Sequence, residues 1–134
     1  VVECPKCGLG LVEIKCQYKH KDEEWRNMKP SDIARNPNFC CQLENNKLKL
    51  KQNHNYYFQI MGQMALMELQ HCDFVIWTRK GMSVERISFD EDFWLENLQK
   101  LENFYTRNMV AELATLRVKN GIPLHSILGI SKTI

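Results

Sequence analysis

One short stretch decides how this chain is expected to fold: Gly10-Leu11-Val12-Glu13-Ile14-Lys15-Cys16. Side chains two apart in a strand share a face, so Glu13 and Lys15 are predicted to stand side by side, about 6–7 Å apart. A carboxylate beside an ammonium at a strand end suits metal-assisted hydrolysis of a phosphodiester. The carboxylate can hold a hard divalent cation, and the ammonium can orient water or neutralise developing charge. The alternative is a surface ion pair, because so short a motif recurs by accident.

Turn signals and apolar periodicity divide the rest of the chain into the order β-β, loop, α, β-β, α. Strands are expected at Val1–Cys4, Leu11–Cys16, Cys41–Leu43, Lys47–Leu50, Cys72–Thr78 and Met82–Phe89. A polar loop is expected over residues 17–29, and helices at Pro30–Arg35, at Asn55–His71 and from an N-cap at Asp90 to about Leu116. This order predicts an α/β (α+β) fold, a mixed β-sheet flanked by helices, in a single domain over residues 1–134.

Composition excludes several other classes of protein. The chain has 134 residues, of which 44% are hydrophobic and 25% charged, so it is neither collagen-like nor of low complexity nor broadly disordered. Its longest apolar run, Phe74–Trp77, is too short to cross a bilayer, and no signal peptide is visible. We therefore expect no membrane association and an intracellular location, nucleus or cytoplasm. Because no initiator Met is present, we expect an N-terminally truncated piece of a longer protein.

The net charge is +2, and the pI of about 8.2 is below that of a domain that coats nucleic acid. It is compatible with an enzyme that sets carboxylates inside a basic rim.

The six cysteines are interpreted as reduced thiols. Only Cys4-Pro5-Lys6-Cys7 has the spacing of metal ligands. A structural zinc ion needs four ligands, normally two such pairs, and a second pair is missing. Zinc at Cys4 and Cys7 is therefore disfavoured against a turn between two strands with unligated thiols.

A second group of polar side chains lies on the long central helix. Tyr56, Gln59 and Gln63 stand at i, i+3 and i+7 and share one helical face. Amide side chains one turn apart can bond a phosphate, a metal-bound water or the strand carboxylate. A solvated polar face explains the same spacing.

A third feature is the basic turn Arg79-Lys80-Gly81, which follows an apolar strand. It either contacts a DNA backbone or is simply solvated. The alternating lysines at 47, 49 and 51 are interpreted as a solvated edge strand.

Four segments carry a resemblance when they are taken in order: Gly10–Cys16, Asn53–Met64, Cys72–Gly81 and Val84–Trp94. Together they resemble the YqaJ-type viral recombinase family, which groups with the phage lambda exonuclease in the PD-(D/E)xK nuclease superfamily. The resemblance spans roughly residues 1 to 113.

The resemblance implies a restriction-endonuclease-like core and Mg²⁺-dependent cleavage of DNA, with Mn²⁺ as a substitute. In relatives this is usually 5′-to-3′ digestion of linear duplex ends, which leaves a single strand for an annealing protein. The implied partners are double-stranded DNA ends, a single-strand annealing protein and further copies of the chain.

The resemblance also implies roles for individual residues. Glu13 would be a catalytic metal ligand, with the backbone carbonyl of Ile14 in the same metal shell, and Lys15 would be the catalytic lysine. Gln59 would join them from the helix beside the active site.

Tyr56 and Gln63 are matched by the family's helix pattern and are expected to contact DNA. Arg79 and Lys80 are expected to contact it as well.

Two departures from the family pattern bear on the chemistry. The second metal-binding carboxylate of the family is an Asp that would fall directly before Val1, and Glu3 could replace it only by proximity. Gln17 stands where the family usually has Pro. An inactive, nuclease-derived DNA-binding or protein-interaction module therefore stays open as an alternative, as does an interaction domain whose Cys4/Cys7 hairpin binds zinc.

Overall fold

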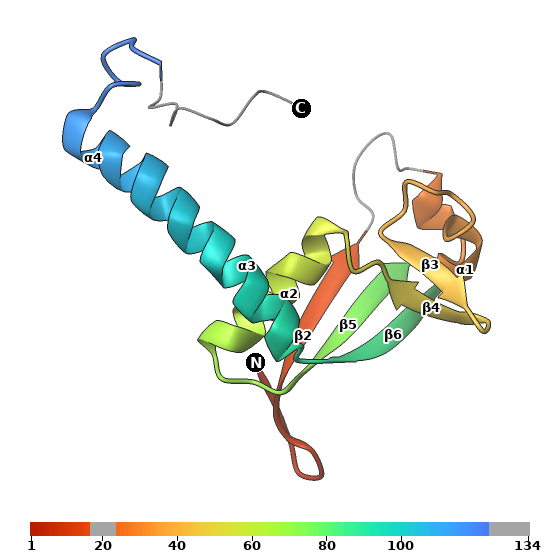
Figure 1. The fold of residues 1–134 in the computed structure, drawn as a ribbon. Coiled ribbons are helices and arrows are strands. Elements are labelled where there is room, and N and C mark those ends of the chain that lie inside the picture. The colour runs from red at the N-terminus through yellow and green to blue at the C-terminus, as the bar shows by residue number, and fades with distance from the viewer. Residues whose placement is uncertain (17–23, 124–134) are drawn as a thin grey trace. The chain divides into compact units, whose positions relative to one another are not determined.

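The computed structural model describes residues 1–16 and 24–123, which fall into two compact units, one over Val1–Asp90 and one that begins at Glu91. The predicted single domain stays a prediction, and each unit is described by itself. The first unit contains β1 (Val2–Cys4), β2 (Gly8–Cys16), the 3₁₀ helix η2 (Trp25–Asn27), α1 (Pro30–Ile33), β3 (Cys41–Glu44), β4 (Lys47–Leu50), α2 (Asn55–Leu66), β5 (His71–Thr78) and β6 (Gly81–Ser88) (Figure 1). Part of the loop expected over residues 17–29 lies outside the described residues.

A four-stranded mixed sheet in the order β1-β2-β5-β6 forms the first unit's framework. The pairs β1–β2 and β5–β6 are antiparallel, whereas β2 and β5 run parallel, with Glu13 opposite Phe74 and Lys15 opposite Ile76. Parallel neighbours need a long crossover connection. Here that connection contains α1, the β3–β4 hairpin and α2. The mixed α+β class predicted from the sequence is confirmed.

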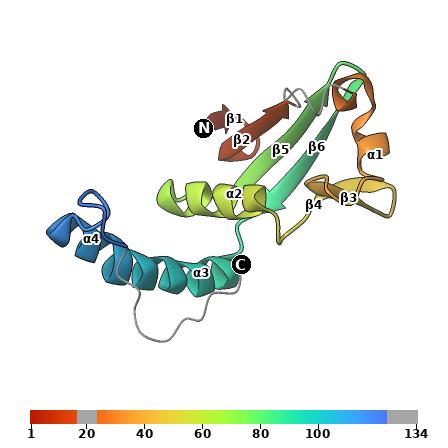
Figure 2. The same cartoon turned by 90° about the horizontal axis from the view of Figure 1, so that it is seen from above.

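One face of the sheet packs against α2, as the view from above shows (Figure 2). The fully buried side chains of this core come from both layers: Ile60, Met61 and Met64 from α2, and Cys72, Phe74 and Ile76 from β5. Burial of apolar surface of this kind is the main driving force of folding. Because strand side chains alternate, the residues of β2 that share this face with Phe74 and Ile76 are Glu13 and Lys15.

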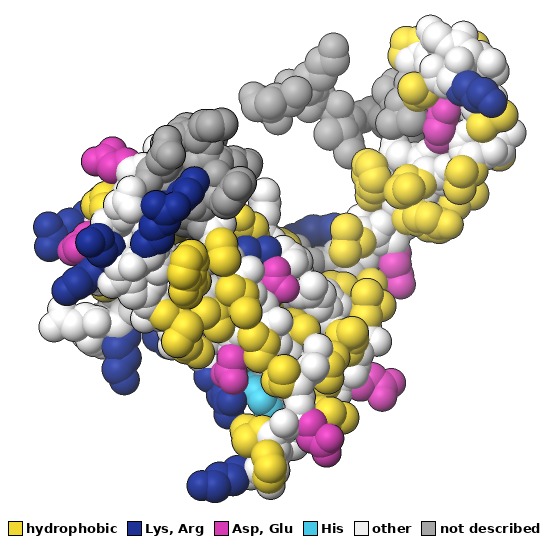
Figure 3. Space-filling model, turned by 180° about the vertical axis from the view of Figure 1, so that it is seen from behind, with side chains coloured by type: hydrophobic (Ala, Val, Ile, Leu, Met, Phe, Trp, Pro, Cys, Tyr) yellow, Lys and Arg dark blue, Asp and Glu magenta, His cyan; other side chains and the backbone are white. Residues whose placement is uncertain are grey.

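The opposite face of the sheet exposes apolar side chains. Figure 3 shows hydrophobic side chains gathered there, and they include Ile14, Trp77, Met82 and Val84, which are 57%, 47%, 64% and 54% exposed. The face also carries an ion pair in which Arg86 donates two hydrogen bonds of 2.7 Å to Asp73.

The hairpin β3–β4 forms at the position that the sequence predicts. Its strands pair from Cys41–Leu50 to Glu44–Lys47, so the turn consists of Asn45 and Asn46. Both residues have positive φ, 49° and 61°. Asparagine tolerates this left-handed conformation, which a two-residue hairpin turn requires.

The central helix is shorter than predicted: α2 ends at Leu66, five residues before the expected end at His71. The helix closes because Glu68 takes a positive φ of 55° and the amide of Leu69 donates back to the Met64 carbonyl. Leu69 is then buried, and His71 already belongs to β5. Apolar periodicity continued across this turn, which is why the sequence did not reveal the boundary.

The second unit is helical, as expected from Asp90 onward. It consists of α3 (Glu91–Phe104), a π-helical turn η3 (Tyr105–Val110) and α4 (Ala111–Thr115), and it ends where Leu116 takes a left-handed conformation. The π turn was not predicted. No helix among the residues described is long and apolar enough to cross a membrane.

Candidate active site

Glu13 and Lys15 form a direct ion pair on the α2 side of the sheet. Lys15 Nζ lies 2.6 Å from Glu13 Oε1, and the two side chains are only 17% and 19% exposed. A surface ion pair would be free to separate into water, whereas these two groups are largely shielded from it. The geometry therefore does not resemble the solvated pair that the sequence left as an alternative.

Gln59 connects the strand pair to the helix. Its amide nitrogen, Nε2, donates to Glu13 Oε1 at 3.0 Å, and its amide oxygen, Oε1, accepts from Lys15 Nζ at 3.0 Å. The three side chains thus form a closed triangle of contacts, from residues 44 and 46 positions apart. We call Glu13, Lys15 and Gln59 the site triad. Each amide atom of Gln59 bonds the partner of complementary polarity, which fixes its orientation.

Both contacts to Glu13 fall on the same carboxylate oxygen. Lys15 Nζ and Gln59 Nε2 approach Oε1, and neither of these contacts uses the second oxygen, Oε2. The triad therefore holds the carboxylate in one orientation and leaves an oxygen for a further ligand.

Tyr56 covers the ammonium of Lys15. The Nζ atom lies 4.1 Å from the centre of the Tyr56 ring, a distance at which the π face attracts a cation. Lys15 is therefore surrounded by a carboxylate, an amide oxygen and an aromatic ring. Each of these stabilises its positive charge.

His54 is a site neighbour that the sequence reasoning missed. Its Nδ1 accepts the Tyr56 amide at 3.1 Å, which caps the start of α2, and its ring lies 4.7 Å from the Tyr56 ring. Burial, and then the positive charges of Lys51 and Lys15, hold the pKa of His54 below its ordinary value of 6.5. Histidine is not among the residues usually found at an N-cap, which are Ser, Thr, Asp and Asn, so the local sequence pattern did not identify it.

The remaining predicted residues lie outside the triad. Gln63 lies one turn beyond Gln59 on α2, and its Oε1 is buried with no hydrogen-bond partner among the described residues. The Ile14 side chain points to the opposite face, as strand alternation requires, so the proposed role of its carbonyl stays a prediction. Arg79 and Lys80 are exposed in the β5–β6 turn, where the Lys80 amide donates to Thr78 Oγ1.

No second carboxylate joins Glu13 within the part of the chain that the structure describes. Glu85 shares the α2 side of the sheet and the same cross-strand row, but Phe74 stands between them and two strand spacings amount to about 10 Å. Its carboxylate is already used, since it pairs with Lys49 at 3.2 Å and accepts the Leu50 amide at 2.6 Å. Glu85 therefore attaches the hairpin to the sheet.

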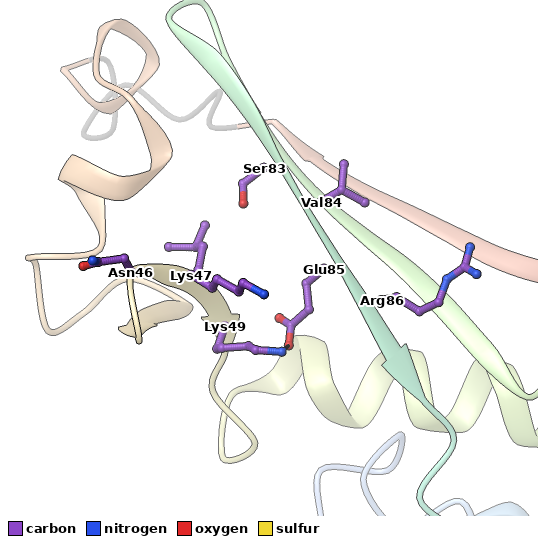
Figure 4. A pocket seen from close by; sticks show the side chains of 8 residues that line it. Asn46, Lys47, Lys49, Ser83, Val84, Glu85 and Arg86 are labelled. Carbon is purple, nitrogen blue, oxygen red and sulfur yellow. Dashed lines mark ion pairs between the residues drawn. The ribbon is translucent and has the colours of Figure 1, made fainter.

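Figure 4 shows this arrangement at a groove of about 500 Å³ between β4 and β6, with Glu85 reaching toward Lys49. Lys49 is thus an ion-pair partner, while Lys51 donates to the Pro37 carbonyl at 2.6 Å. The solvated-edge interpretation is incomplete, because Lys49 and Lys51 are partly exposed and each also holds a loop or strand in place.

Two other carboxylates are also separate from Glu13. Asp73 belongs to the face of the sheet away from α2 and is paired with Arg86. Glu3 is exposed on β1 and stands opposite Leu9, at the start of β2. In the described ranges no three His, Cys, Asp or Glu side chains gather as a metal site would require, Cys4 and Cys7 included.

The donors at the site suit a divalent cation. Mg²⁺ retains several of its waters and needs only one or two protein carboxylates. Glu13 offers one free carboxylate oxygen, held in place by Lys15 and Gln59, so the chemistry of this donor set fits a hydrated Mg²⁺. Comparisons with protein-family models, with curated proteins and with solved structures find no match to this chain.

Proposed function

We propose that this chain carries the active site of a Mg²⁺-dependent deoxyribonuclease of the recombination type, which hydrolyses phosphodiester bonds at the ends of linear duplex DNA. The observation that carries the proposal is the site triad: a shielded carboxylate, ammonium and amide in mutual contact, contributed by a strand and a helix. The parallel β2–β5 pair with α2 packed on it supports a restriction-endonuclease-like core, as the resemblance implies.

Glu13 would hold the cation through its carboxylate, and by the resemblance the Ile14 carbonyl would be a second ligand. A bound Mg²⁺ supplies a polarised water and neutralises charge on the phosphate. Lys15 places its positive charge next to that position, where it stabilises the charge that develops on the phosphoryl oxygens.

Gln59 is a positioning residue in this proposal. It holds the Glu13 carboxylate through Nε2 and the Lys15 ammonium through Oε1. Tyr56 and Gln63, on the same helix, would contact the DNA that enters the site.

A second carboxylate is expected, by resemblance, on residues that precede Val1. We therefore expect residues 1–134 alone to bind Mg²⁺ weakly and to cleave slowly. A version of the protein extended upstream of Val1 would cleave faster.

The dependence of DNA cleavage on Mg²⁺ and on Glu13 tests this function. The substrate is a 5′-phosphorylated linear duplex, incubated with residues 1–134 and with the extended version, in Mg²⁺, in Mn²⁺ and in EDTA. We expect cleavage by the extended version in both metals, none in EDTA, and a loss of about 100-fold or more in Glu13→Gln. Glu44→Gln, on an exposed strand of the hairpin, is the matched control and should cleave like the parent.

Failure of the folded, extended version to cut DNA in either metal would overturn the proposal. It would favour the inactive DNA-binding or interaction module, which the absence of a second carboxylate beside Glu13 in the described residues already keeps as the alternative.

A further inference from the structure

Four basic residues lie at the end of the first unit where β5 turns into β6. They are Arg26 and Lys29, from the segment around η2, and Arg79 and Lys80, from the β5–β6 turn. We call these four residues the turn patch. The sequence suggested only the second pair, because the two pairs are about fifty positions apart.

Direct contacts bring the two segments together. The Arg79 amide donates to the Arg26 carbonyl at 2.9 Å. A Cβ built on Gly81 would lie 3.9 Å from the Pro30 ring, so the residue after Lys29 packs beside the end of the turn. The patch is therefore a feature of the fold.

Acidic residues are few in the two described segments that carry the turn patch. Residues 24–30 and 78–81 together contain these four cations and a single acidic residue, Glu24. Lys29, Arg79 and Lys80 are exposed and form no ion pair with any described residue. Figure 3 shows Lys and Arg side chains gathered over the end of the first unit that carries this region. Such a concentration of like charge attracts a polyanion.

The patch also lies close to the site triad along the sheet. Lys15 stands opposite Ile76, and Arg79 follows three residues after Ile76, directly beyond the end of β5 and about 10 Å farther along. For a duplex whose axis runs along these strands, at 3.4 Å of axis per nucleotide, this distance corresponds to about three nucleotides. The patch is thus at the carboxyl ends of the parallel strands β2 and β5, the edge at which parallel sheets commonly bind ligands.

We propose that the turn patch, Arg26, Lys29, Arg79 and Lys80, binds the sugar-phosphate backbone of duplex DNA about three nucleotides from the bond held at Lys15. This inference rests on the proposed nuclease function and specifies how that substrate is held. The contacts are electrostatic and independent of sequence, since they are made to phosphates and not to base edges.

Salt-dependent binding tests the inference without requiring cleavage. The probe is a blunt duplex of about 20 base pairs with a fluorescein label, whose anisotropy is measured in Ca²⁺ across a range of KCl concentrations. Each lost phosphate contact should reduce the slope of log K against log salt by about 1. We expect a reduction of about 2 in Arg79→Ala/Lys80→Ala and of about 1 in Lys29→Ala, with affinity at about 0.1 M salt reduced roughly three- to tenfold.

Lys6→Ala is the matched control. Lys6 is an exposed lysine in the turn before β2, so it lies at the opposite end of that strand from Lys15. Its removal should leave the slope unchanged. Lys29→Glu is a second variant, and it should weaken binding more than Lys29→Ala does.

The inference is overturned if the slopes of the patch variants equal that of the parent, if Lys6→Ala changes the slope as much as they do, or if the parent does not bind the duplex. The outcome is separate from that of the proposed function. Slopes that change as expected, in a protein that cuts no DNA, would support the patch and count against the nuclease. Cleavage of DNA, with salt-dependence slopes in the patch variants equal to that of the parent, would support the nuclease and count against the patch.

Discussion

Lys15 is the residue around which the site is organised. Its ammonium contacts a carboxylate at 2.6 Å, an amide oxygen at 3.0 Å and an aromatic ring at 4.1 Å, while its side chain is 17% exposed. A largely buried ammonium is costly unless its hydrogen-bonding capacity is used. The three partners meet that requirement, which explains why a charged pair can lie beneath α2.

Replacement of Gln59 by Ala should reduce both stability and activity. The variant loses two hydrogen bonds and leaves Glu13 and Lys15 less firmly oriented, so the free energy of unfolding should fall by about 1–2 kcal/mol. Urea denaturation measures this change. Gln99→Ala, at an exposed position of α3, is the matched control and should unfold like the parent. A Gln59→Ala variant as stable as that control would contradict the triad geometry.

The Asp73–Arg86 pair predicts a specific loss of stability in acid. The hydrogen bonds from Arg86 hold the pKa of Asp73 below its ordinary value of 3.8. Since the folded-state pKa is the lower one, the stabilisation is complete above about pH 4 and is lost as the pH falls through the folded-state value. Asp73→Asn should therefore lose less stability than the parent between about pH 4 and pH 2, as measured by urea midpoints. Equal losses of stability in the parent and in Asp73→Asn would argue against the ion pair.

At the scale of elements, the sequence pattern predicted which side chains share a face of a strand or helix, because neighbouring residues determine this. Strand alternation placed Glu13 and Lys15 on one face, and helical spacing placed Gln59 on a face of α2. The sequence could not show that these two faces meet, because that depends on the parallel β2–β5 register and on the crossover between them. His54 and the early end of α2 were missed for a related reason: both are set by a few backbone hydrogen bonds at a helix end.

The β3–β4 turn gives a prediction at this scale. Glycine adopts positive φ without steric cost, so Asn46→Gly should raise the free energy of unfolding by about 0.5 kcal/mol. Asn46→Val should lower it by about 1–2 kcal/mol, because a β-branched residue is strained at a φ of 61°. Thermal unfolding of the two variants measures the difference. Equal stability of the two would mean that the turn is not left-handed.

At the scale of the whole molecule, the order of strands and helices was predictable and the division into two units was not. Fold class follows from the sequence of elements, whereas compactness depends on contacts between distant residues. No second metal-binding carboxylate can be assigned from the sequence or from the described residues. Such a carboxylate therefore enters only through the resemblance.

Cysteine alkylation tests the arrangement of the first unit. Cys7 and Cys16 are exposed, whereas Cys40, Cys41 and Cys72 are buried, and burial raises the pKa of the Cys72 thiol to about 11. Because the thiolate is the reactive form, iodoacetamide at about pH 8 should label Cys7 and Cys16 rapidly and the three buried thiols only after unfolding. Peptide mass spectrometry reads the pattern. Rapid labelling of Cys72 in the native protein would be incompatible with the sheet packing.

The most direct test of the central claim is the rate at which the upstream-extended protein and its Lys15→Ala variant cleave 5′-phosphorylated linear duplex DNA in Mg²⁺. Both proteins are first shown to be folded, and Lys47→Ala, an exposed lysine of the hairpin, serves as the control. The account predicts a loss of about 100-fold or more in Lys15→Ala and none in Lys47→Ala. Cleavage by Lys15→Ala at the parent rate would contradict it, and so would a folded parent that leaves the duplex intact.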